Sequence, residues 1–242
     1  MCICKDRCII MTDYTNKCIK KMNDSFQIIS SLNVTDNPVG ICQIDSSLLA
    51  VTLINDMAVQ FISQKEPMKL QQSFKVGNRC RGIAYNDKML YVCCGGIEDH
   101  EGVGHLEVYS LSGALLTSYY GEIELPTRVA ISSSAAEIFV IDGYKGILHI
   151  DKNQRFIPVD NKASKSTGCI CKINKSQFCV AFCNSHNILL MARDGKVQVE
   201  LLRRKDGIIN PIGLCFDNKT SRLLVSCFES DNIMVYTLKI SN

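Results

Sequence analysis

A short phrase that recurs about every 40 residues constrains this chain more than any other feature. Each copy opens with a glycine, or its replacement, followed by an apolar residue, and continues through a polar turn into a β-rich run. The opening positions are Gly40, Gly82, Arg128, Gly168 and Gly213, which stand 40 to 46 residues apart. A fixed period of this length, composed of strands and turns, is typical of a β-propeller.

Each copy predicts three short strands, and some copies predict a fourth. In the copy that opens at Gly40, strands are expected at 41–44, 48–52 and 57–62, and turns rich in Asp, Asn and Ser separate them. A fourth, outer strand is clear at 115–119 and at 197–201. The sequence therefore predicts an all-β fold, a six-bladed β-propeller whose first and last blades are incomplete.

We expect a single domain, residues 1–242, and six blades within it. Their approximate limits are 1–37, 38–79, 80–125, 126–165, 166–210 and 211–242. The first blade leaves only residues 2–4 for its first strand, and the last blade has no sequence for an outer strand. Because native proteins avoid exposed sheet edges, we expect the chain to be a C-terminal piece of a longer protein, or to have a truncated N-terminus.

The repeat resembles the NHL repeat. The segments that match the family pattern are 16–19, 38–41, 126–130, 138–142, 211–214 and 231–236. The Arg that follows the closing Asn in the family is mostly absent. WD40 repeats are disfavoured because the chain contains no Trp. The pattern is more similar to the C-terminal propellers of tripartite-motif (RING, B-box, coiled-coil) proteins than to free-standing NHL enzymes.

This resemblance implies a non-catalytic binding module. In that family the propeller is the substrate-recognition part of an E3 ubiquitin ligase, and its top face binds a protein or, in some members, an RNA. A protein partner is therefore expected, with an RNA-binding propeller in post-transcriptional regulation as the alternative. The Cys/His spacing of RING and B-box modules is absent from this sequence, so no ligase chemistry is expected within it.

Composition restricts the partner and the compartment. The net charge is only +3, which gives no strong sequence-independent attraction to nucleic acid or membranes. No stretch of 18 apolar residues predicts a membrane span, and the charged N-terminus does not resemble a secretory signal. A cytoplasmic location is expected. Most of the 14 cysteines fall in predicted strands, where we expect buried thiols, and no paired Cys-x-x-Cys predicts a metal site; no cofactor is expected either.

The loops are the candidate binding sites. In a propeller, the loop between the second and third strands and the loop that enters the first strand open on the same face, here called the top face. The candidate residues on these loops are Tyr14, Lys17, Arg79, Arg81, Arg128, Tyr144, Lys145, Asn184 and His186. Arg can hold carboxylates or phosphates in bidentate fashion, and Tyr can stack on bases. The alternative is a set of solvated turn charges, balanced by nearby acids such as Asp13, Asp56, Asp142, Glu229 and Asp231.

One insertion, residues 95–105, carries the densest group of possible ligands in the chain. It contains four glycines together with Glu98, Asp99, His100, Glu101 and His105. His100 and His105 have a spacing that could hold a metal, but a mobile acidic loop does so poorly without support. We expect a variable loop tip that influences the choice of partner.

An enzyme is the remaining alternative. Gluconolactonase-like propellers hold a metal in the central channel, and the oxygens of Asp13, Asn55, Asp142 and Asn184 could bind Ca²⁺. Turn geometry alone also selects Asn and Asp. The sequence has no nucleophile elbow, no His-Glu-x-x-His and no phosphate-binding glycine loop, so a chain without catalysis of its own is favoured.

The incomplete blades predict self-association. Expressed alone, the chain should be poorly soluble or should oligomerise through open sheet edges, because unpaired strands pair with other chains. Size-exclusion chromatography with light scattering, followed by thermal melting, tests this expectation. A sharply melting monomer would show that the inferred truncation is wrong.

Overall fold

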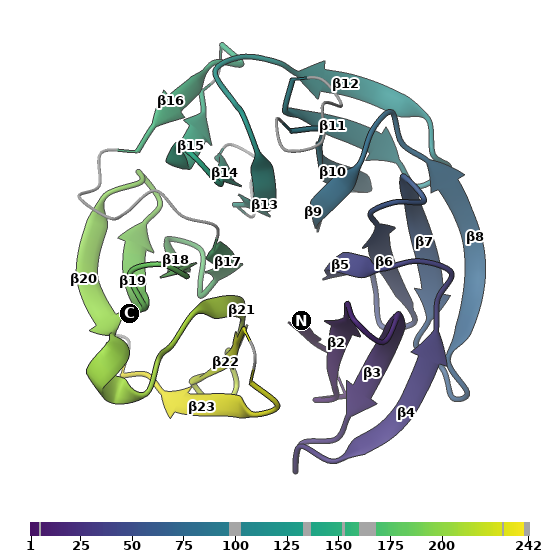
Figure 1. Ribbon diagram of the computed structural model, residues 1–242, viewed down its shortest axis with the longest axis horizontal. Coiled ribbons are helices and arrows are strands. Elements are labelled where there is room, and N and C mark those ends of the chain that lie inside the picture. The colour runs from purple at the N-terminus through teal and green to yellow at the C-terminus, as the bar shows by residue number, and fades with distance from the viewer. Residues whose placement is uncertain are drawn as a thin grey trace. The chain divides into compact units, whose positions relative to one another are not determined.

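The computed structural model describes residues 1–4, 6–96, 103–132, 137–151, 153–159, 168–228 and 230–239. These residues form six antiparallel sheets, five with four strands and one with three (Figure 1). The chain divides into two compact units, Met1–Val129 and Ala130–Asn242. No helix in the described part of the chain is long and apolar enough to cross a bilayer.

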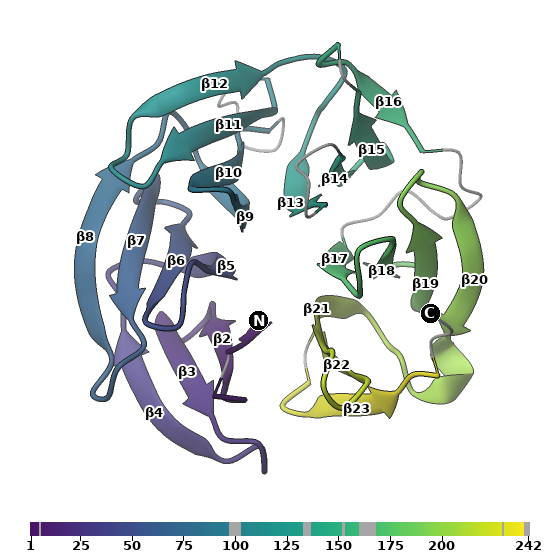
Figure 2. The same ribbon diagram turned by 180° about the vertical axis from the view of Figure 1, so that it is seen from behind.

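The first unit contains three sheets in which the strands follow one another in sequence order. Their strands are β1 (Cys2–Ile3), β2 (Ile9–Asp13), β3 (Cys18–Met22), β4 (Ile28–Asn33), β5 (Pro38–Gln43), β6 (Leu48–Leu53), β7 (Ala58–Ser63), β8 (Lys69–Lys75), β9 (Cys80–Asn86), β10 (Met89–Cys94), β11 (His105–Ser110) and β12 (Leu115–Tyr119). β5 and β9, the first strands of neighbouring sheets, lie side by side in both views (Figures 1 and 2).

The second unit contains the remaining three sheets, and β13 spans the limit between the two units. Their strands are β13 (Pro126–Ile131), β14 (Ile138–Asp142), β15 (Gly146–Ile150), β16 (Phe156–Pro158), β17 (Gly168–Lys172), β18 (Gln177–Phe182), β19 (Asn187–Ala192), β20 (Val197–Leu202), β21 (Pro211–Asp217), β22 (Arg222–Cys227) and β23 (Ile233–Thr237). A short 3-10 helix, η2 (Arg204–Asp206), follows β20.

The strands of each sheet lie within the predicted blade limits, and β1 has only two residues where the sequence left little room. The structure adds the outer strands β8 and β16, which no clear sequence pattern predicts. β8 is exposed along almost its whole length and reads KLQQSFK, so it lacks the apolar alternation that marks a half-buried strand. The assignment of all 242 residues to one domain stays a prediction.

Close backbone approach explains the glycine that opens the repeat. A Cβ at Gly40 would collide with the backbone oxygen of Arg81, and a Cβ at Gly82 would lie 2.6 Å from the Cα of Arg128. The buried hydroxyl of Thr52 sits at the first of these contacts. It accepts the Gly40 N–H at 2.8 Å and donates to the Arg81 carbonyl at 2.5 Å. The first strands of neighbouring sheets therefore meet backbone to backbone.

Both faces of the second strand in each middle sheet are buried. Successive side chains of a strand point to opposite faces. Along β6, Leu49 and Val51 pack with Ile10 of the preceding sheet, whereas Ala50 packs with Leu90 of the following sheet. The same alternation holds for β18 in the second unit, whose two faces join two different clusters. This double burial explains why these strands read as nearly continuous apolar runs.

The cysteines belong to the same packing. All 14 are free thiols, nine of them buried and five partly buried. Several, such as Cys4, Cys80 and Cys179, belong to the apolar clusters between the sheets, as the sequence predicts, whereas the Cys94 thiol donates to a carboxylate.

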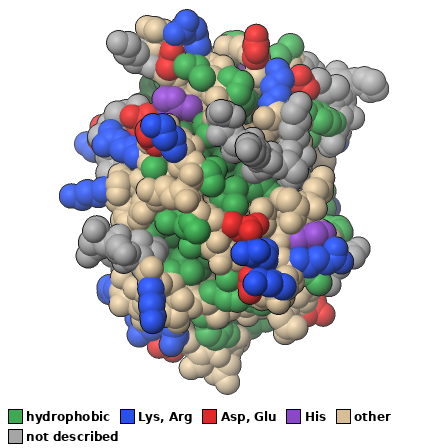
Figure 3. Space-filling view, turned by 90° about the vertical axis from the view of Figure 1, so that its left-hand side faces the viewer, with side chains coloured by type: hydrophobic (Ala, Val, Ile, Leu, Met, Phe, Trp, Pro, Cys, Tyr) green, Lys and Arg blue, Asp and Glu red, His purple; other side chains and the backbone are tan. Residues whose placement is uncertain are grey.

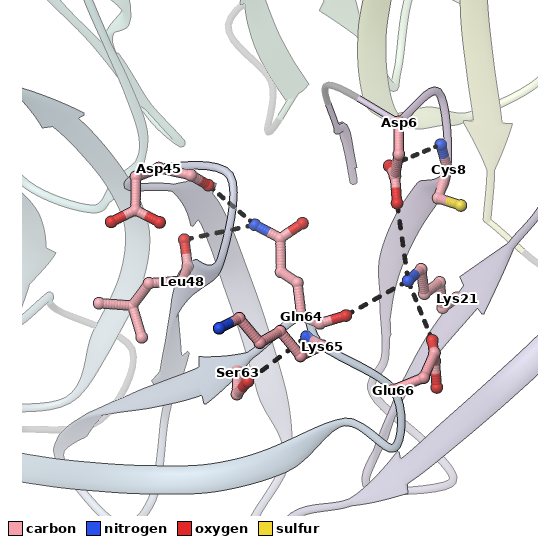
Figure 4. Close-up of polar contacts among 9 residues, drawn as sticks. All are labelled: Asp6, Cys8, Lys21, Asp45, Leu48, Ser63, Gln64, Lys65 and Glu66. Carbon is pink, nitrogen blue, oxygen red and sulfur yellow. Dashed lines mark hydrogen bonds and ion pairs between the residues drawn. The ribbon is translucent and has the colours of Figure 1, made fainter.

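A buried lysine also joins the first sheet to the second, near the turns that follow β1 and β7. Lys21 on β3 is 5% exposed, and its Nζ pairs with Glu66 at 2.9 Å and with Asp6 at 3.7 Å, and donates to the Gln64 carbonyl at 3.3 Å (Figure 4). Burial lowers the pKa of Lys21, but the hydrogen bond and charge of Glu66 outweigh it, so the pKa is raised. Gln64 in turn donates to the Asp45 carbonyl.

Replacing Thr52 tests the backbone contact. Thr52→Val keeps the shape of the side chain but leaves the Gly40 N–H and the Arg81 carbonyl without their buried partner. Each unsatisfied group costs about 1–3 kcal/mol, so we expect a loss of about 2–4 kcal/mol in the free energy of unfolding, measured by urea denaturation. Thr52→Ser, which retains the hydroxyl, should lose about 1 kcal/mol. Equal losses in the two variants would contradict the bridging role.

Candidate functional site

The turns between second and third strands share one conformation. In four of the described turns the last residue is left-handed: Lys17 (φ 48°), Met57 (φ 47°), Gly146 (φ 82°) and His186 (φ 53°). The N–H of Lys17 donates to the Tyr14 carbonyl, three residues earlier, and the N–H of Met57 donates to the Ile54 carbonyl in the same way. Each turn is therefore a closed, short structure that exposes the side chains at its tip.

A carboxylate ties these turns to the loops that enter the first strands. Asp36, in the loop before β5, accepts the backbone N–H groups of Asn55 and Asp56 and the Asn55 amide, at 2.5, 3.0 and 2.9 Å. The neighbouring Asn37 donates to the Tyr14 carbonyl at 2.8 Å. Burial raises the pKa of Asp36, but these hydrogen bonds outweigh it and hold the pKa below its ordinary value of 3.8. The loop and turn are thus fixed together in the first unit.

The predicted residues of the first unit differ in exposure. Tyr14 is 53% exposed, and Lys17 is exposed beside it at the same turn. Arg79 and Arg128 are half-buried. Arg81 is only 9% exposed, and its guanidinium donates to the Gly95 carbonyl at 2.6 Å. Arg81 therefore supports the base of the 95–104 loop.

Arg128 follows a similar pattern, because its guanidinium donates to the carbonyl of Thr127 at 2.8 Å. It lies against Gly82, the residue after Arg81. The structure thus brings Arg81 and Arg128 near one another through their strands, while Tyr14 and Lys17 form a separate exposed pair on the first sheet.

The predicted residues of the second unit are held by their own turns. Asp142 is fully buried and accepts the backbone N–H groups of Tyr144 at 2.9 Å and Lys145 at 3.0 Å. Tyr144 is 41% exposed. Asn184 is exposed, whereas His186 is half-buried and its Nδ1 accepts the backbone N–H of Asn210 at 3.1 Å. His186 therefore holds a neighbouring loop.

Three of the acidic residues expected as counter-charges or Ca²⁺ ligands hydrogen-bond within or beside the turns. Asp13 pairs with Lys20 at 2.5 Å. It also accepts the backbone N–H of Asn16 and the side-chain amide N–H of the same residue. Asp56 accepts the Thr35 hydroxyl. With Asp142 holding its own turn, turn geometry accounts for the recurrence of Asp and Asn at these positions. Glu229 lies outside the described residues.

A buried polar cluster that the sequence did not predict lies at the β10–β11 hairpin. His105 is the first residue of β11 and pairs in register with Cys94, the last residue of β10. Glu107 and Tyr109 follow on the same face of β11, and all four side chains are buried. The expected companions Glu98, Asp99, His100 and Glu101 lie outside the described residues.

Glu107 is the centre of this cluster. Its Oε2 accepts the Tyr109 hydroxyl at 2.7 Å and the Cys94 thiol at 3.1 Å, and its Oε1 lies 3.3 Å from His105 Nε2. Burial raises the pKa of Glu107, but hydrogen bonds from His105, Tyr109 and Cys94 outweigh it and lower the pKa to about 2. Burial lowers the pKa of His105, but its bonds to Glu107 and Val103 reverse the direction and raise it.

Part of this cluster is visible in the sequence, as polar residues at every second position of a strand. His105, Glu107 and Tyr109 stand two residues apart in a strand, which places them on one face. The contribution of Cys94 depends on the register of the hairpin, which the length of the insertion concealed.

Comparison with known proteins gives a fold and no family. No protein-family model matches the sequence, and no curated protein matches it. Among solved structures, hydrazine synthase from Kuenenia stuttgartiensis is 13% identical with a TM-score of 0.72, over 99% of this chain and 95% of that one. A streptogramin B lyase is 11% identical with a TM-score of 0.71, over 99% and 82%. The β-propeller domain of Cps50 (Swd1) from Myceliophteria thermophila is 10% identical with a TM-score of 0.67, over 98% and 82%.

These similarities show the fold alone. The all-β class and the six-bladed β-propeller predicted from the repeat are confirmed. The resemblance to NHL repeats and to tripartite-motif proteins stays a prediction, and so do the binding residues.

The anchoring role of Asp36 gives a pH-dependent prediction. Asp36→Ala removes three hydrogen bonds to an ionised group, so we expect a loss of about 2–4 kcal/mol in the free energy of unfolding at pH 7. The folded state lowers the pKa of Asp36, so its stabilisation is complete above the unfolded pKa of about 3.8 and is lost as pH falls through the lower, folded pKa. Urea denaturation at pH 7 and at several acidic pH values measures the difference.

The matched control is Asp56→Ala, in the same loop cluster. Asp56 accepts one exposed hydroxyl through its side chain, so its loss should cost less than about 1 kcal/mol. A difference between wild type and Asp36→Ala that does not shrink on acidification would contradict the anchoring role.

Proposed function

We propose that this chain is a non-catalytic binding module that takes a protein partner on the turns between its second and third strands. The observation that carries this proposal is the recurrence of exposed large apolar side chains at those turns. Single exposed apolar residues are ordinary on protein surfaces, but repetition at one structural position needs an explanation.

Five of the six sheets present such a residue among the described turns. They are Tyr14 (53% exposed), Met57 (39%), Val103 (62%), Tyr144 (41%) and Phe228 (56%). Tyr, Phe and Met are enriched in the cores of protein–protein interfaces, and Tyr is a frequent hot-spot residue. The closed turns at Tyr14 and Met57 and the Asp142-bound turn at Tyr144 hold these three side chains at little further cost in conformational entropy on binding.

Charge favours a protein partner over RNA. Lys17 is exposed beside Tyr14, but Arg81 and Arg128 direct their guanidinium groups to backbone carbonyls. Non-specific RNA binding relies on many cations along the backbone path, and the chain as a whole carries only +3. A mixed surface of aromatic, apolar and a few cationic residues suits a protein better.

The finer proposal is substrate recognition for an E3 ubiquitin ligase of the tripartite-motif type. It rests on the NHL-like residues of the repeat. The similar structures include a streptogramin B lyase, a virginiamycin B lyase and the Cps50 (Swd1) propeller, but at 10–14% identity their activities carry no argument for this chain.

Exposed apolar residues also occur on the outer strands, and these supply the control for a binding test. In the second unit they include Ile157, Val197 and Val199, and Figure 3 shows hydrophobic side chains on that side, interrupted by polar and charged ones. In the first unit Leu115 and Leu116 on β12 are more than half exposed. These residues are of similar size to the turn residues but lie elsewhere on the sheets.

The test compares Tyr14→Ser/Val103→Ser with the control Leu115→Ser/Leu116→Ser. Proteins captured from cytosolic lysate by wild type, after RNase treatment, are quantified by mass spectrometry. The turn variant should recover a given partner at least about tenfold less well, since each hot-spot anchor contributes more than 1 kcal/mol. The control should recover it as wild type does.

Two outcomes would count against the proposal. Equal recovery by the turn variant and the control would show that the turns do not bind. Recovery that collapses with RNase would instead favour the RNA-binding alternative.

A further inference from the structure

We propose that Cys94, His105 and Glu107 form a Zn²⁺ site at the base of the β10–β11 hairpin. One sulfur, one imidazole nitrogen and one carboxylate oxygen from these residues all lie within 4.8 Å of one another. Thiolate, imidazole and carboxylate are the ligands that zinc takes in proteins. The argument for this site does not rest on the binding function proposed above, although Val103 is common to both.

The hydrogen bonds of His105 carry the argument. Its Nδ1 lies 2.9 Å from the Val103 carbonyl, which can only accept, so Nδ1 must carry a proton. In a neutral ring Nε2 then presents a lone pair. That lone pair faces the Oε1 of Glu107 at 3.3 Å, and Glu107 is an acceptor too. The contact is favourable only if a proton or another cation lies between the two atoms.

A zinc ion satisfies this contact with balanced charge. Without metal, a protonated His105, an ionised Glu107 and a neutral Cys94 thiol make the pocket neutral, and this ion pair by itself satisfies the contact. With Zn²⁺ bound, the ligands are a neutral His105, an ionised Glu107 and a Cys94 thiolate, and the pocket is again neutral. Binding one ion therefore releases two protons, one from the imidazolium and one from the thiol, as metal binding to protonated ligands requires.

The distances fit a tetrahedral ion. Zinc–ligand bonds of about 2.0–2.3 Å place neighbouring ligand atoms about 3.4–3.6 Å apart. The structure has Cys94 Sγ 3.1 Å from Glu107 Oε2, and His105 Nε2 3.3 Å from Glu107 Oε1. These contacts use the two different oxygens of Glu107, and the three ligand atoms lie within 4.8 Å of one another, so the side chains would close on a common ion when it binds.

The surroundings hold these ligands in place. The Val103 carbonyl fixes the His105 tautomer, which is the usual outer-shell arrangement for a metal-bound histidine. The Tyr109 hydroxyl donates to Glu107 at 2.7 Å, and Tyr120 stacks on the His105 ring at 4.9 Å between centroids. The absence of a side chain at Gly77 leaves space for the Glu107 carboxylate, because a Cβ there would come within 2.8 Å of Glu107 Oε1.

The site would also tie together the two ends of the 95–104 loop. Cys94 immediately precedes this loop and His105 immediately follows it. A metal shared by these residues adds a link to a closure that the pairing of Cys94 with His105 already makes. Val103, one of the exposed turn residues, stands directly beside this closure.

The experiment measures metal binding by the purified chain. The protein is stripped with chelator, exchanged into buffer and titrated with ZnCl₂ against a chromophoric chelator. CoCl₂ then replaces zinc as a spectroscopic probe. We expect one equivalent of Zn²⁺ and, with Co²⁺, a thiolate-to-metal charge-transfer band with intense tetrahedral d–d absorption. Cys94→Ser should abolish the charge-transfer band, and Cys94→Ser or His105→Gln should weaken zinc binding at least about 100-fold.

Two matched controls isolate the site. Cys93→Ser alters the adjacent buried thiol, which pairs with Leu106 and points to the opposite face of β10. His149→Gln alters the other histidine–glutamate pair, where Nε2 lies 2.6 Å from Glu137. Both should bind zinc within about threefold of wild type, a change below 1 kcal/mol.

The proposal is overturned if folded wild-type protein, verified by circular dichroism, takes up no stoichiometric zinc. It is also overturned if the cobalt charge-transfer band persists in Cys94→Ser, or if the two site variants bind as the controls do. Should a site variant fail to fold, the wild-type cobalt spectrum and zinc protection of Cys94 from alkylation decide the question by themselves.

Discussion

The approach of one backbone to the next at the repeat glycine is the constraint on which the rest of the first unit depends. At Gly40 no Cβ fits, because the Arg81 carbonyl occupies its place, and the Thr52 hydroxyl joins the two strands. This contact sets the spacing between neighbouring sheets. At that spacing the side chains of β6 reach apolar partners on both sides, which explains why residues 48–53 can be almost wholly apolar.

Much of the fold could be predicted from the sequence because burial and sequence pattern coincide in the inner strands. In the middle sheets the second and third strands are buried on two faces, so they appear as short apolar runs between polar turns. The outer strands β8 and β16 do not show this apolar pattern. β8 is exposed and largely polar, and β16 has only three residues. Their pairing is decided by backbone hydrogen bonds to β7 and β15, which leave little trace in side-chain pattern.

The candidate sites were less predictable because they depend on contacts between distant residues. Tyr14 is exposed, as expected for a turn, but Arg81 is covered because its guanidinium finds the carbonyl of Gly95. The sequence predicts a strand from His105 to Tyr109 after the insertion, and the structure places His105 at the start of β11, where its side chain is buried. Its position beside Cys94 follows from hairpin register, and register across an insertion of this length cannot be read from residue spacing.

The double burial of β6 has a consequence for motion. Leu49 and Val51 belong to one apolar cluster and Ala50 to another, so the two clusters share a single strand. Separating the β5–β8 sheet from either neighbour would expose apolar surface on two sheets together. Amide exchange in β6 should therefore proceed through a collective opening of the whole first unit rather than by the fraying of one sheet.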